Sequence, residues 1–197
     1  MKKRIAYVRA VQALQQGGVV AIPTETVYGL ACDPRNTRAV QRVFALKGRD
    51  PNKPLLLVAG SLAQVQQVAV LDALAKRIAK RYWPGALTLI LPIKQPTELV
   101  SGVAVHGGVA IRYSSSPIVQ TLARRFGYPL VATSANKSGE PVCQSVRAIR
   151  RALPEIAEVI DVGFLSPRAP STVIRIKKDG SIEYVRRGAI KNIRLEP

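Results

Sequence analysis

Residues 46–55 read Leu-Lys-Gly-Arg-Asp-Pro-Asn-Lys-Pro-Leu and separate a helix-like run from an apolar, strand-like run. Gly48 and Pro51 stop a helix from continuing, so we expect Lys47, Arg49 and Lys53 on a short loop held by rigid elements on both sides. Cations fixed in this way suit several anionic oxygens at once, such as nucleotide phosphates or a carboxylate. A basic surface loop without a ligand explains this stretch, taken alone, equally well.

The overall composition bounds the fold and the compartment. The 197 residues, 47% of them hydrophobic, fit one globular domain that can build its core without disulfides or metals. The longest apolar run, residues 86–93, contains a proline and is too short to cross a bilayer. Arg9 and several glutamines interrupt the segment after the basic start of the chain, so we expect no signal peptide. We therefore predict a cytoplasmic protein without a membrane segment.

Cysteine and histidine are too sparse for several common kinds of site. Cys32 and Cys143 are far apart in the sequence, and His106 is the single histidine. These residues cannot form a usual zinc site, and we expect no metal site made by the protein alone. A Ser-His-Asp mechanism would need His106, which lies in Val-His-Gly-Gly without a nucleophile elbow, so we discount that mechanism.

The chain carries 30 basic and 12 acidic residues, a net charge of +18. A surplus of this size attracts polyanions without reading their sequence. Aromatic residues make up only 5% of the chain and do not alternate with the cations, so a base-stacking platform is not indicated. We expect at most weak, salt-sensitive binding of tRNA or other RNA.

Hydrophobic periodicity predicts one α/β domain over residues 1–197, with a twisted mixed sheet flanked by helices. Apolar residues at helical spacing predict helices over 5–16, 37–46, 72–82, 117–126 and 145–152, and Ser61 is expected to begin a further short helix. Apolar runs predict strands over 19–22, 54–59, 86–91, 109–113, 130–133 and 158–162. Residues 172–176 and 182–185 flank Asp179-Gly180, a strong hairpin signal.

Three further features suggest a ligand pocket, each with an alternative. If the strand over 19–22 continues, Thr24, Thr26 and Tyr28 share one face and line a pocket; a half-exposed β segment fits equally well. The strand over 130–133 runs into small polar residues, 134–139, at a sheet edge where α/β folds bind ligands, although an ordinary turn is the commoner explanation. Arg112 interrupts an apolar strand, so it is either exposed or holds an anion.

Taken together, these segments resemble the short, single-domain form of the YrdC-like (TsaC) threonylcarbamoyl-adenylate synthases, whose fold is also similar to that of the dihydroxybutanone-phosphate synthases (YrdC/RibB-like). The matching blocks follow the family's order within a core of about residues 5–190. They are Pro23-Thr-Glu-Thr-Val-Tyr-Gly-Leu30, Lys47-Gly-Arg49, Lys53-Pro-Leu55, Trp83-Pro-Gly-Ala-Leu-Thr-Leu89, Ala110-Ile-Arg112, Thr133-Ser-Ala-Asn-Lys-Ser-Gly139, Pro170-Ser-Thr-Val173 and Val185-Arg-Arg-Gly188.

The resemblance implies a reaction of L-threonine, bicarbonate or CO2, and ATP that gives threonylcarbamoyl-AMP and pyrophosphate. ATP is the substrate, with Mg2+ expected on its phosphates. A separate TsaD-type transferase complex would pass the threonylcarbamoyl group to adenosine 37 of tRNAs that read ANN codons.

The resemblance also implies roles for individual residues, and we expect positions 47–53 and 134–136 to converge around one triphosphate. The catalytic residues would be Lys47, Arg49, Ser134 and Asn136. Contacts to ATP would come from Arg49, Lys53, Ser134, Asn136, the backbone near Val142, and Arg186. The threonine pocket would be formed by Thr24, Thr26, Arg112, the backbone of Ala132, and Ser171.

The sequence departs from the family pattern at two places. A histidine that is frequent in the strand after Lys-Pro-Leu is absent from Leu57-Val58-Ala59, and a frequent Pro-x-His-Pro is replaced by Ser114-Ser-Ser-Pro117. Both departures fall near the expected threonine pocket.

Three rival functions share this fold. The first is a non-catalytic RNA-binding or ribosome-associated module, which the net charge favours. The second is the carbamoyl-adenylate domain of hydrogenase-maturation carbamoyltransferases, whose zinc-finger and acylphosphatase segments have no counterpart here. The third is a dihydroxybutanone-phosphate synthase, which needs an acidic metal-binding cluster that the sequence lacks.

Overall fold

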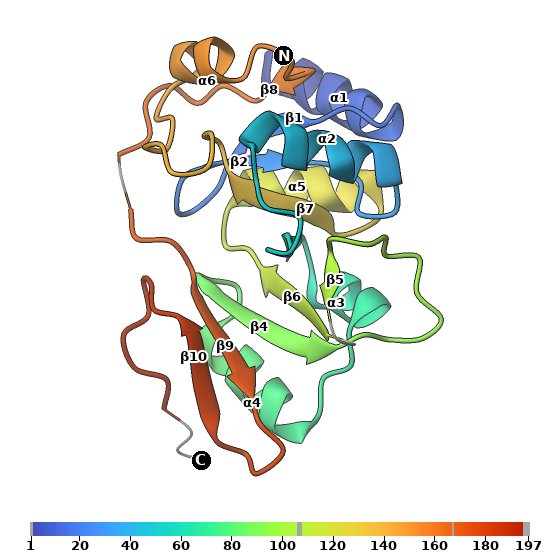
Figure 1. Cartoon of the computed structure of the whole chain (residues 1–197), viewed down its shortest axis with the longest axis vertical. Coiled ribbons are helices and arrows are strands. Elements are labelled where there is room, and N and C mark those ends of the chain that lie inside the picture. Colours follow the sequence, from blue (N-terminus) through green and yellow to red (C-terminus); the bar gives the residue numbers. More distant parts are fainter. Residues whose placement is uncertain (1, 106–107, 167, 195–197) are drawn as a thin grey trace.

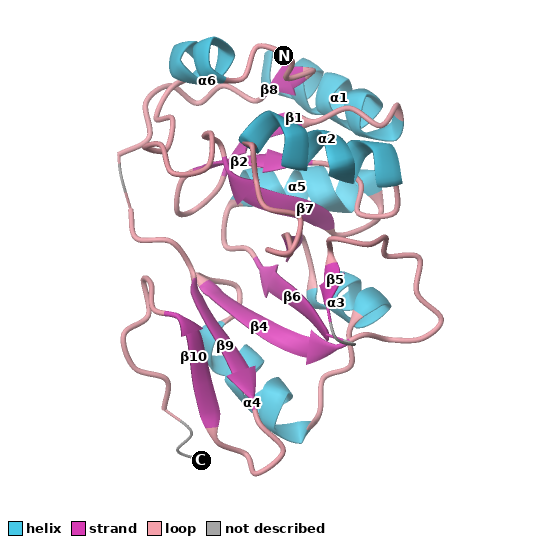
Figure 2. Ribbon diagram, viewed as in Figure 1, coloured by secondary structure: helices cyan, strands magenta, loops and turns pink. Residues whose placement is uncertain are grey.

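A mixed β-sheet runs through the whole molecule (Figures 1 and 2). The computed structural model describes residues 2–105, 108–166 and 168–194, so the expectation for His106 lies outside the described residues. The sheet has the strand order β10-β9-β4-β6-β3-β7-β2-β1-β8, with β5 beside β6. Its strands are β1 (Val20–Pro23), β2 (Tyr28–Ala31), β3 (Leu56–Ala59), β4 (Leu87–Pro92), β5 (Ala104–Val105), β6 (Gly108–Tyr113), β7 (Leu130–Ser134), β8 (Glu158–Val159), β9 (Thr172–Ile176) and β10 (Ile182–Arg186).

Parallel and antiparallel pairs both occur in this sheet. The pairs β3/β6, β4/β9 and β1/β8 are parallel, and the remaining neighbours are antiparallel. Parallel neighbours need a crossover, which the helices supply, while β9 and β10 are joined by the predicted hairpin. The predicted mixed α/β sheet is confirmed.

Helices cover both faces of the sheet. They are α1 (Lys2–Gln15), α2 (Thr37–Lys47), α3 (Leu62–Val68), α4 (Ala73–Tyr82), α5 (Pro117–Phe126) and α6 (Val146–Ala152). Alternate residues of the central strands face two separate cores: Leu57 of β3 packs with residues of α2, α3, α4 and α6, whereas Val58 packs with residues of α1 and α5. Successive side chains of a strand point to opposite faces, so these buried strands need apolar residues at every position.

The helix boundaries follow the chemical signals in the sequence. Ser61, Asp72 and Ser116 cap α3, α4 and α5. Each side chain accepts a hydrogen bond from the backbone N–H of the residue three positions later. Gly127 ends α5 in a left-handed conformation that favours glycine. Within the described residues, no helix is both long enough and apolar enough to span a membrane.

One condition near the site is not met, and one prediction there was wrong. The strand over 19–22 does not continue through Tyr28, because the Thr24 hydroxyl accepts from the N–H groups of Thr26 and Val27 and turns the chain back into the antiparallel β2. Lys47 does not lie on a loop either: it is the last residue of α2, and Gly48 ends the helix at a φ of 55°. Two strands are also shorter than predicted, since β3 begins at Leu56 and β8 ends at Val159.

Candidate active site

Segments that are distant in the sequence together line a cavity of about 340 Å³. Its wall comes from the turn between β1 and β2, the loop before β3, the end of β7, the segment before β9 and the end of β10. The lining residues include nine of the predicted site residues: Thr24, Thr26, Arg49, Arg112, Ala132, Ser134, Val142, Ser171 and Arg186.

Lys47 joins the two segments that were expected to converge. Its side chain is buried behind the cavity wall, and its Nζ donates to the carbonyl oxygen of Ser134 at 2.6 Å, the carbonyl oxygen of Asn136 at 2.8 Å and Asn136 Oδ1 at 3.1 Å. A protonated lysine has three N–H donors for these three acceptors, whereas a neutral amine has only two. The expected convergence of positions 47–53 and 134–136 is therefore confirmed.

Two opposing effects act on the charge of Lys47. Burial, and to a lesser extent the nearby Arg49 cation, lower the pKa of Lys47 to about 8. The three acceptor oxygens favour the protonated form. The charge of Lys47 therefore depends on the segment of Ser134 and Asn136, which supplies these acceptors.

Ser134 and Asn136 are held by the same network. Ser134 Oγ donates to Asn136 Oδ1 at 2.6 Å, and Asn136 Nδ2 donates to the carbonyl oxygen of Glu140 at 2.6 Å. Ser134 lines the cavity, whereas Asn136 is buried and stands behind it. The carboxamide therefore fixes the serine hydroxyl beside the cavity.

Arg49 is fixed at the cavity by the main chain of its own loop. Its Nε donates to the carbonyl oxygen of Lys53 at 2.9 Å, and its Nη2 donates to that of Pro54 at 3.1 Å. Desolvation lowers the pKa of Arg49, and Asp50 partly opposes this effect. The Lys53 side chain is exposed and is not part of the cavity wall; the structure places only its carbonyl oxygen in the site's hydrogen bonding.

Arg186 approaches the cavity from the end of β10. Its Nε and Nη2 donate to the carbonyl oxygen of Ser171 at 3.1 and 2.9 Å, and Nη2 also donates to Ser171 Oγ at 2.9 Å. The buried hydroxyl of Thr88 lies 2.9 Å from the same Oγ. Desolvation lowers the pKa of Arg186, and the cations Arg112 and Arg49 lower it further. The guanidinium groups of Arg49, Arg112 and Arg186 are therefore close enough to repel one another, and together they make the cavity strongly positive.

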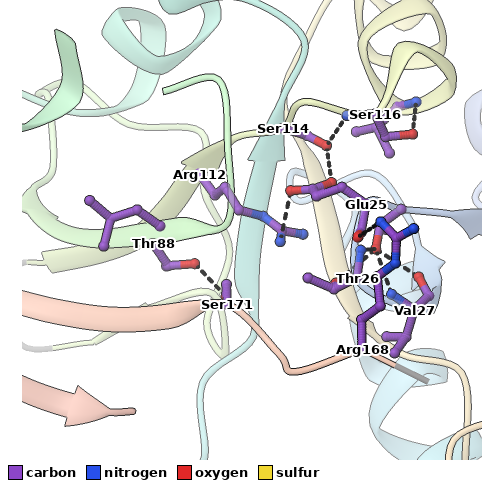
Figure 3. A network of polar contacts seen from close by, with 12 residues as sticks. Glu25, Thr26, Val27, Thr88, Arg112, Ser114, Ser116, Arg168 and Ser171 are labelled. Atoms are coloured by element: carbon purple, nitrogen blue, oxygen red, sulfur yellow. Dashed lines mark hydrogen bonds and ion pairs between the residues drawn. The ribbon is translucent and has the colours of Figure 1, made fainter. Parts of the chain in front are cut away.

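Arg112 meets the second of the two expectations for it: it is buried, and the anion that it holds is the carboxylate of Glu25. Figure 3 shows its side chain between Ser171 and the segment of Glu25 and Thr26. Its Nη1 lies 3.0 Å from Glu25 Oε1. Desolvation lowers the pKa of Arg112, and Glu25 opposes this effect. The chain itself thus supplies a counter-ion for this buried arginine.

A smaller and more apolar cavity of about 230 Å³ adjoins the first. The two share Val27, Val142 and Arg168 in their walls. Tyr28, Pro141 and Leu165 complete much of the second cavity. The combined space has a cationic part and an apolar part, which suits a ligand with a phosphate end and a flat, apolar end.

Sequence comparison identifies the family to which this site belongs. A family model described as "Telomere recombination", which represents the Sua5, YciO and YrdC proteins, matches residues 12–188. The chain belongs to the Sua5/YciO/YrdC family. The resemblance read from the motifs is confirmed.

Relatives of known name agree with this assignment. The chain is 40% identical over 166 residues to the threonylcarbamoyl-AMP synthase of Chromohalobacter salexigens, which covers 83% of this chain and 89% of the relative. The crystal structure of P. abyssi Sua5 complexed with L-threonine matches with a TM-score of 0.83 at 33% identity over 94% of this chain and 54% of Sua5, so the chain spans about half of Sua5. The structure of E. coli YciO matches with a TM-score of 0.84 at 25% identity, over 98% of this chain and 93% of YciO.

Two residues at or beside the cavities were not predicted from the sequence. Glu25 lies inside the quoted block of residues 23–30, but the expected strand alternation placed it on the face opposite Thr24 and Thr26. Arg168 lines both cavities, and its Nη1 donates to the carbonyl oxygen of Glu25 at 3.3 Å. Its position just before the Pro170 block was the one available signal.

Proposed function

We propose that this chain is an ATP-dependent synthase that makes L-threonylcarbamoyl-AMP from L-threonine, bicarbonate or CO2, and ATP, and releases pyrophosphate. The observation that supports it most directly is the gathering of Arg49, Arg112 and Arg186 with Ser134 around one cavity. The product would serve N6-threonylcarbamoylation of adenosine 37 in tRNAs reading ANN codons, through a separate TsaD-type transferase complex in the cytoplasm.

The chemistry needs positioning and charge neutralisation more than it needs a strong acid or base. The threonine amine attacks CO2, loses a proton and becomes an N-carboxylate. An oxygen of this carboxylate then attacks the α-phosphorus of ATP, and the bond to the bridging oxygen breaks as pyrophosphate leaves. The reacting groups are anionic, so fixed cations that bring them together and stabilise the developing charge lower the barrier.

The residues divide into a nucleotide half and an amino-acid half. Arg49 and Arg186, each held by main-chain carbonyls, face the phosphates, and Ser134 lies beside them in the segment that Lys47 and Asn136 fix. Lys53 meets the phosphates from the exposed side next to Pro54. The adenosine lies in the apolar space beside Val142, which adjoins the arginines.

The amino-acid half is the part of the cavity near the turn between β1 and β2. We assign the threonine to the hydroxyls of Thr24 and Thr26, the Arg112 guanidinium, the backbone of Ala132, and Ser171. A buried guanidinium suits the threonine carboxylate because it offers several N–H donors in one plane. The side-chain hydroxyl of the substrate finds partners among the three hydroxyl groups of the wall.

The residues present fit Mg2+ that arrives on ATP. Within the described ranges, no group of three or more His, Cys, Asp or Glu side chains comes together, and Glu25, beside the cavity, is paired with Arg112. A magnesium ion held by the phosphates would neutralise part of their charge. The arginines of the chain neutralise the remainder and fix the orientation of the nucleotide.

A second candidate is a non-catalytic RNA-binding module, which the net charge of +18 favours. Pyrophosphate release from ATP separates the two. We expect release to require both L-threonine and bicarbonate, and we expect carbamoyl phosphate not to replace them. Arg49→Ala should lower the rate at least a hundredfold, whereas Arg124→Ala, an equal loss of charge on the exposed side of α5, should not. Salt-sensitive tRNA binding without threonine-dependent release would favour the second candidate.

A further inference from the structure

A buried ion pair stands behind the amino-acid half of the cavity. Arg112 lines the cavity with a side chain that is 5% exposed, and its partner Glu25 has a side chain that is 12% exposed. The Nε–H of Arg112 has no hydrogen-bond partner among the residues that the structure describes. Glu25 Oε1 likewise makes no hydrogen bond within the described residues, so the contact between the two groups is an ion pair, with Nη1 3.0 Å from Oε1. The attraction between the two charges orients the guanidinium.

Ser114 fixes this carboxylate in turn. It is fully buried, its Oγ donates to Glu25 Oε2 at 2.5 Å, and the same Oγ accepts from the N–H of Ser116 at 3.2 Å (Figure 3). Because a hydroxyl has one proton, that proton is committed to Glu25. The two oxygens of Glu25 are thus divided, with Oε1 facing Arg112 and Oε2 held by Ser114.

The backbone of Ser114 is anchored independently of its hydroxyl. Its N–H donates to the carbonyl oxygen of Ala59 at 3.2 Å, and its carbonyl oxygen accepts from Gln120 Nε2 at 2.8 Å. Removing the hydroxyl alone leaves both of these bonds in place. A change at this oxygen therefore acts on Glu25 and, through it, on Arg112, and it also removes the acceptor of the Ser116 N–H.

We propose that Ser114 is a positioning residue for the amino-acid half of the site and acts through Glu25 on Arg112; this rests on the proposed function. The nucleotide half is held in a different way, since Arg49 is bonded to main-chain carbonyls of its own loop and Arg186 to Ser171. Removing the Ser114 hydroxyl should therefore weaken the binding of the amino acid and leave the binding of ATP unchanged.

The test compares Ser114→Ala with Ser115→Ala, the same substitution at the exposed neighbour. Steady-state pyrophosphate release gives KM for L-threonine and for ATP, and calorimetry gives threonine binding without turnover. We expect Ser114→Ala to raise KM and Kd for threonine about tenfold, because one hydrogen bond to a charged group is lost. KM for ATP should stay within about twofold, and Ser115→Ala should match the wild type.

Glu25→Gln is the second variant, and it keeps the shape while removing the charge. We expect it to raise KM for threonine about a hundredfold, since one partner of a buried ion pair is replaced. A threonine KM in Ser114→Ala within twofold of wild type, or equal rises in KM for threonine and ATP, would overturn the role of Ser114. If Ser114→Ala does not fold, Ser114→Cys takes its place, because a thiol fills the same space and is only a weak donor. A wild-type enzyme that releases no pyrophosphate with threonine would instead reject the proposed function.

Discussion

Replacing Lys47 with methionine removes one ammonium group and three hydrogen bonds while keeping a side chain of similar length. In the wild type, Lys47 Nζ contacts the carbonyl oxygens of Ser134 and Asn136 and the Oδ1 of Asn136. After the change, the Ser134 carbonyl oxygen still accepts from the N–H of Asn136, and Asn136 Oδ1 still accepts from the Ser134 hydroxyl. The Asn136 carbonyl loses the donor that Lys47 supplied.

The magnitude follows from these losses. A hydrogen bond to a charged group contributes about 1.5–3 kcal/mol, and a buried carbonyl without a donor costs about 1–3 kcal/mol. The removed cost of burying an ammonium offsets part of the sum, so we expect Lys47→Met to lower the free energy of unfolding by about 3 kcal/mol. For a domain of this size that corresponds to a fall in Tm of about 6–12 °C.

The assay is chemical denaturation together with pyrophosphate release. Displacement of Ser134 and Asn136 should lower the rate at least a hundredfold, since a shift of about 1 Å in a site can have that effect. Lys53→Met is the matched control, and its exposed side chain should leave the free energy of unfolding within about 0.5 kcal/mol of wild type. A Lys47→Met protein with wild-type stability and wild-type rate would refute the reasoning.

Three further predictions concern pH, packing and specificity. Because the pKa of Lys47 in the folded state is about 8, below the unfolded value of about 10.4, pyrophosphate release should fall as pH rises through 8. Between pH 8 and about 10.4, Lys47 is protonated in the unfolded chain and neutral in the folded one. Its contribution to the free energy of unfolding should therefore rise with pH in this window. Activity and denaturation curves measured from pH 7 to 10 check both signs. Gly188→Ala would place a Cβ 2.2 Å from the carbonyl oxygen of Pro170 and 2.7 Å from that of Ser171; we expect a loss of about 1–3 kcal/mol in denaturation, with Lys191→Ala as an unaffected control. In substrate competition, valine should be rejected far more strongly than serine, because losing the hydroxyl leaves polar groups unpaired whereas one methyl is worth only about 1–3 kcal/mol; equal use of valine and threonine would contradict the assignment of the amino-acid half.

The fold was largely predictable because local chemistry and tertiary structure agree. Ser61, Asp72 and Ser116 cap helices that begin where the sequence places them, and Asp179-Gly180 joins the expected hairpin. Strands rich in branched apolar residues are buried on both faces, so a continuous apolar run is enough to locate them in the sequence. The position of Lys47 was missed because the predicted helix ended at residue 46. In the structure Lys47 is still helical, and Gly48, in the left-handed region, ends the helix.

The site was predictable only where motif order and spatial neighbourhood coincide. The Lys47 and Ser134 segments were expected together, and the geometry joins them. Glu25 was not found because a hydroxyl-capped turn at Thr24 replaces the strand on which the alternation argument depended. The contact between Ser114 and Glu25 spans 89 positions, and no spacing rule in one sequence reports a pair so far apart.

The central claim is that this cavity joins three substrates into one adenylate. The most direct measurement incubates the enzyme with ATP, L-threonine and ¹³C-bicarbonate and analyses the AMP-containing products by mass spectrometry at early times. The account predicts one new species that contains AMP, threonine and a single ¹³C atom, and whose amount falls at least a hundredfold with Arg49→Ala. Unlabelled AMP alone, or a labelled product that forms without threonine, would contradict it.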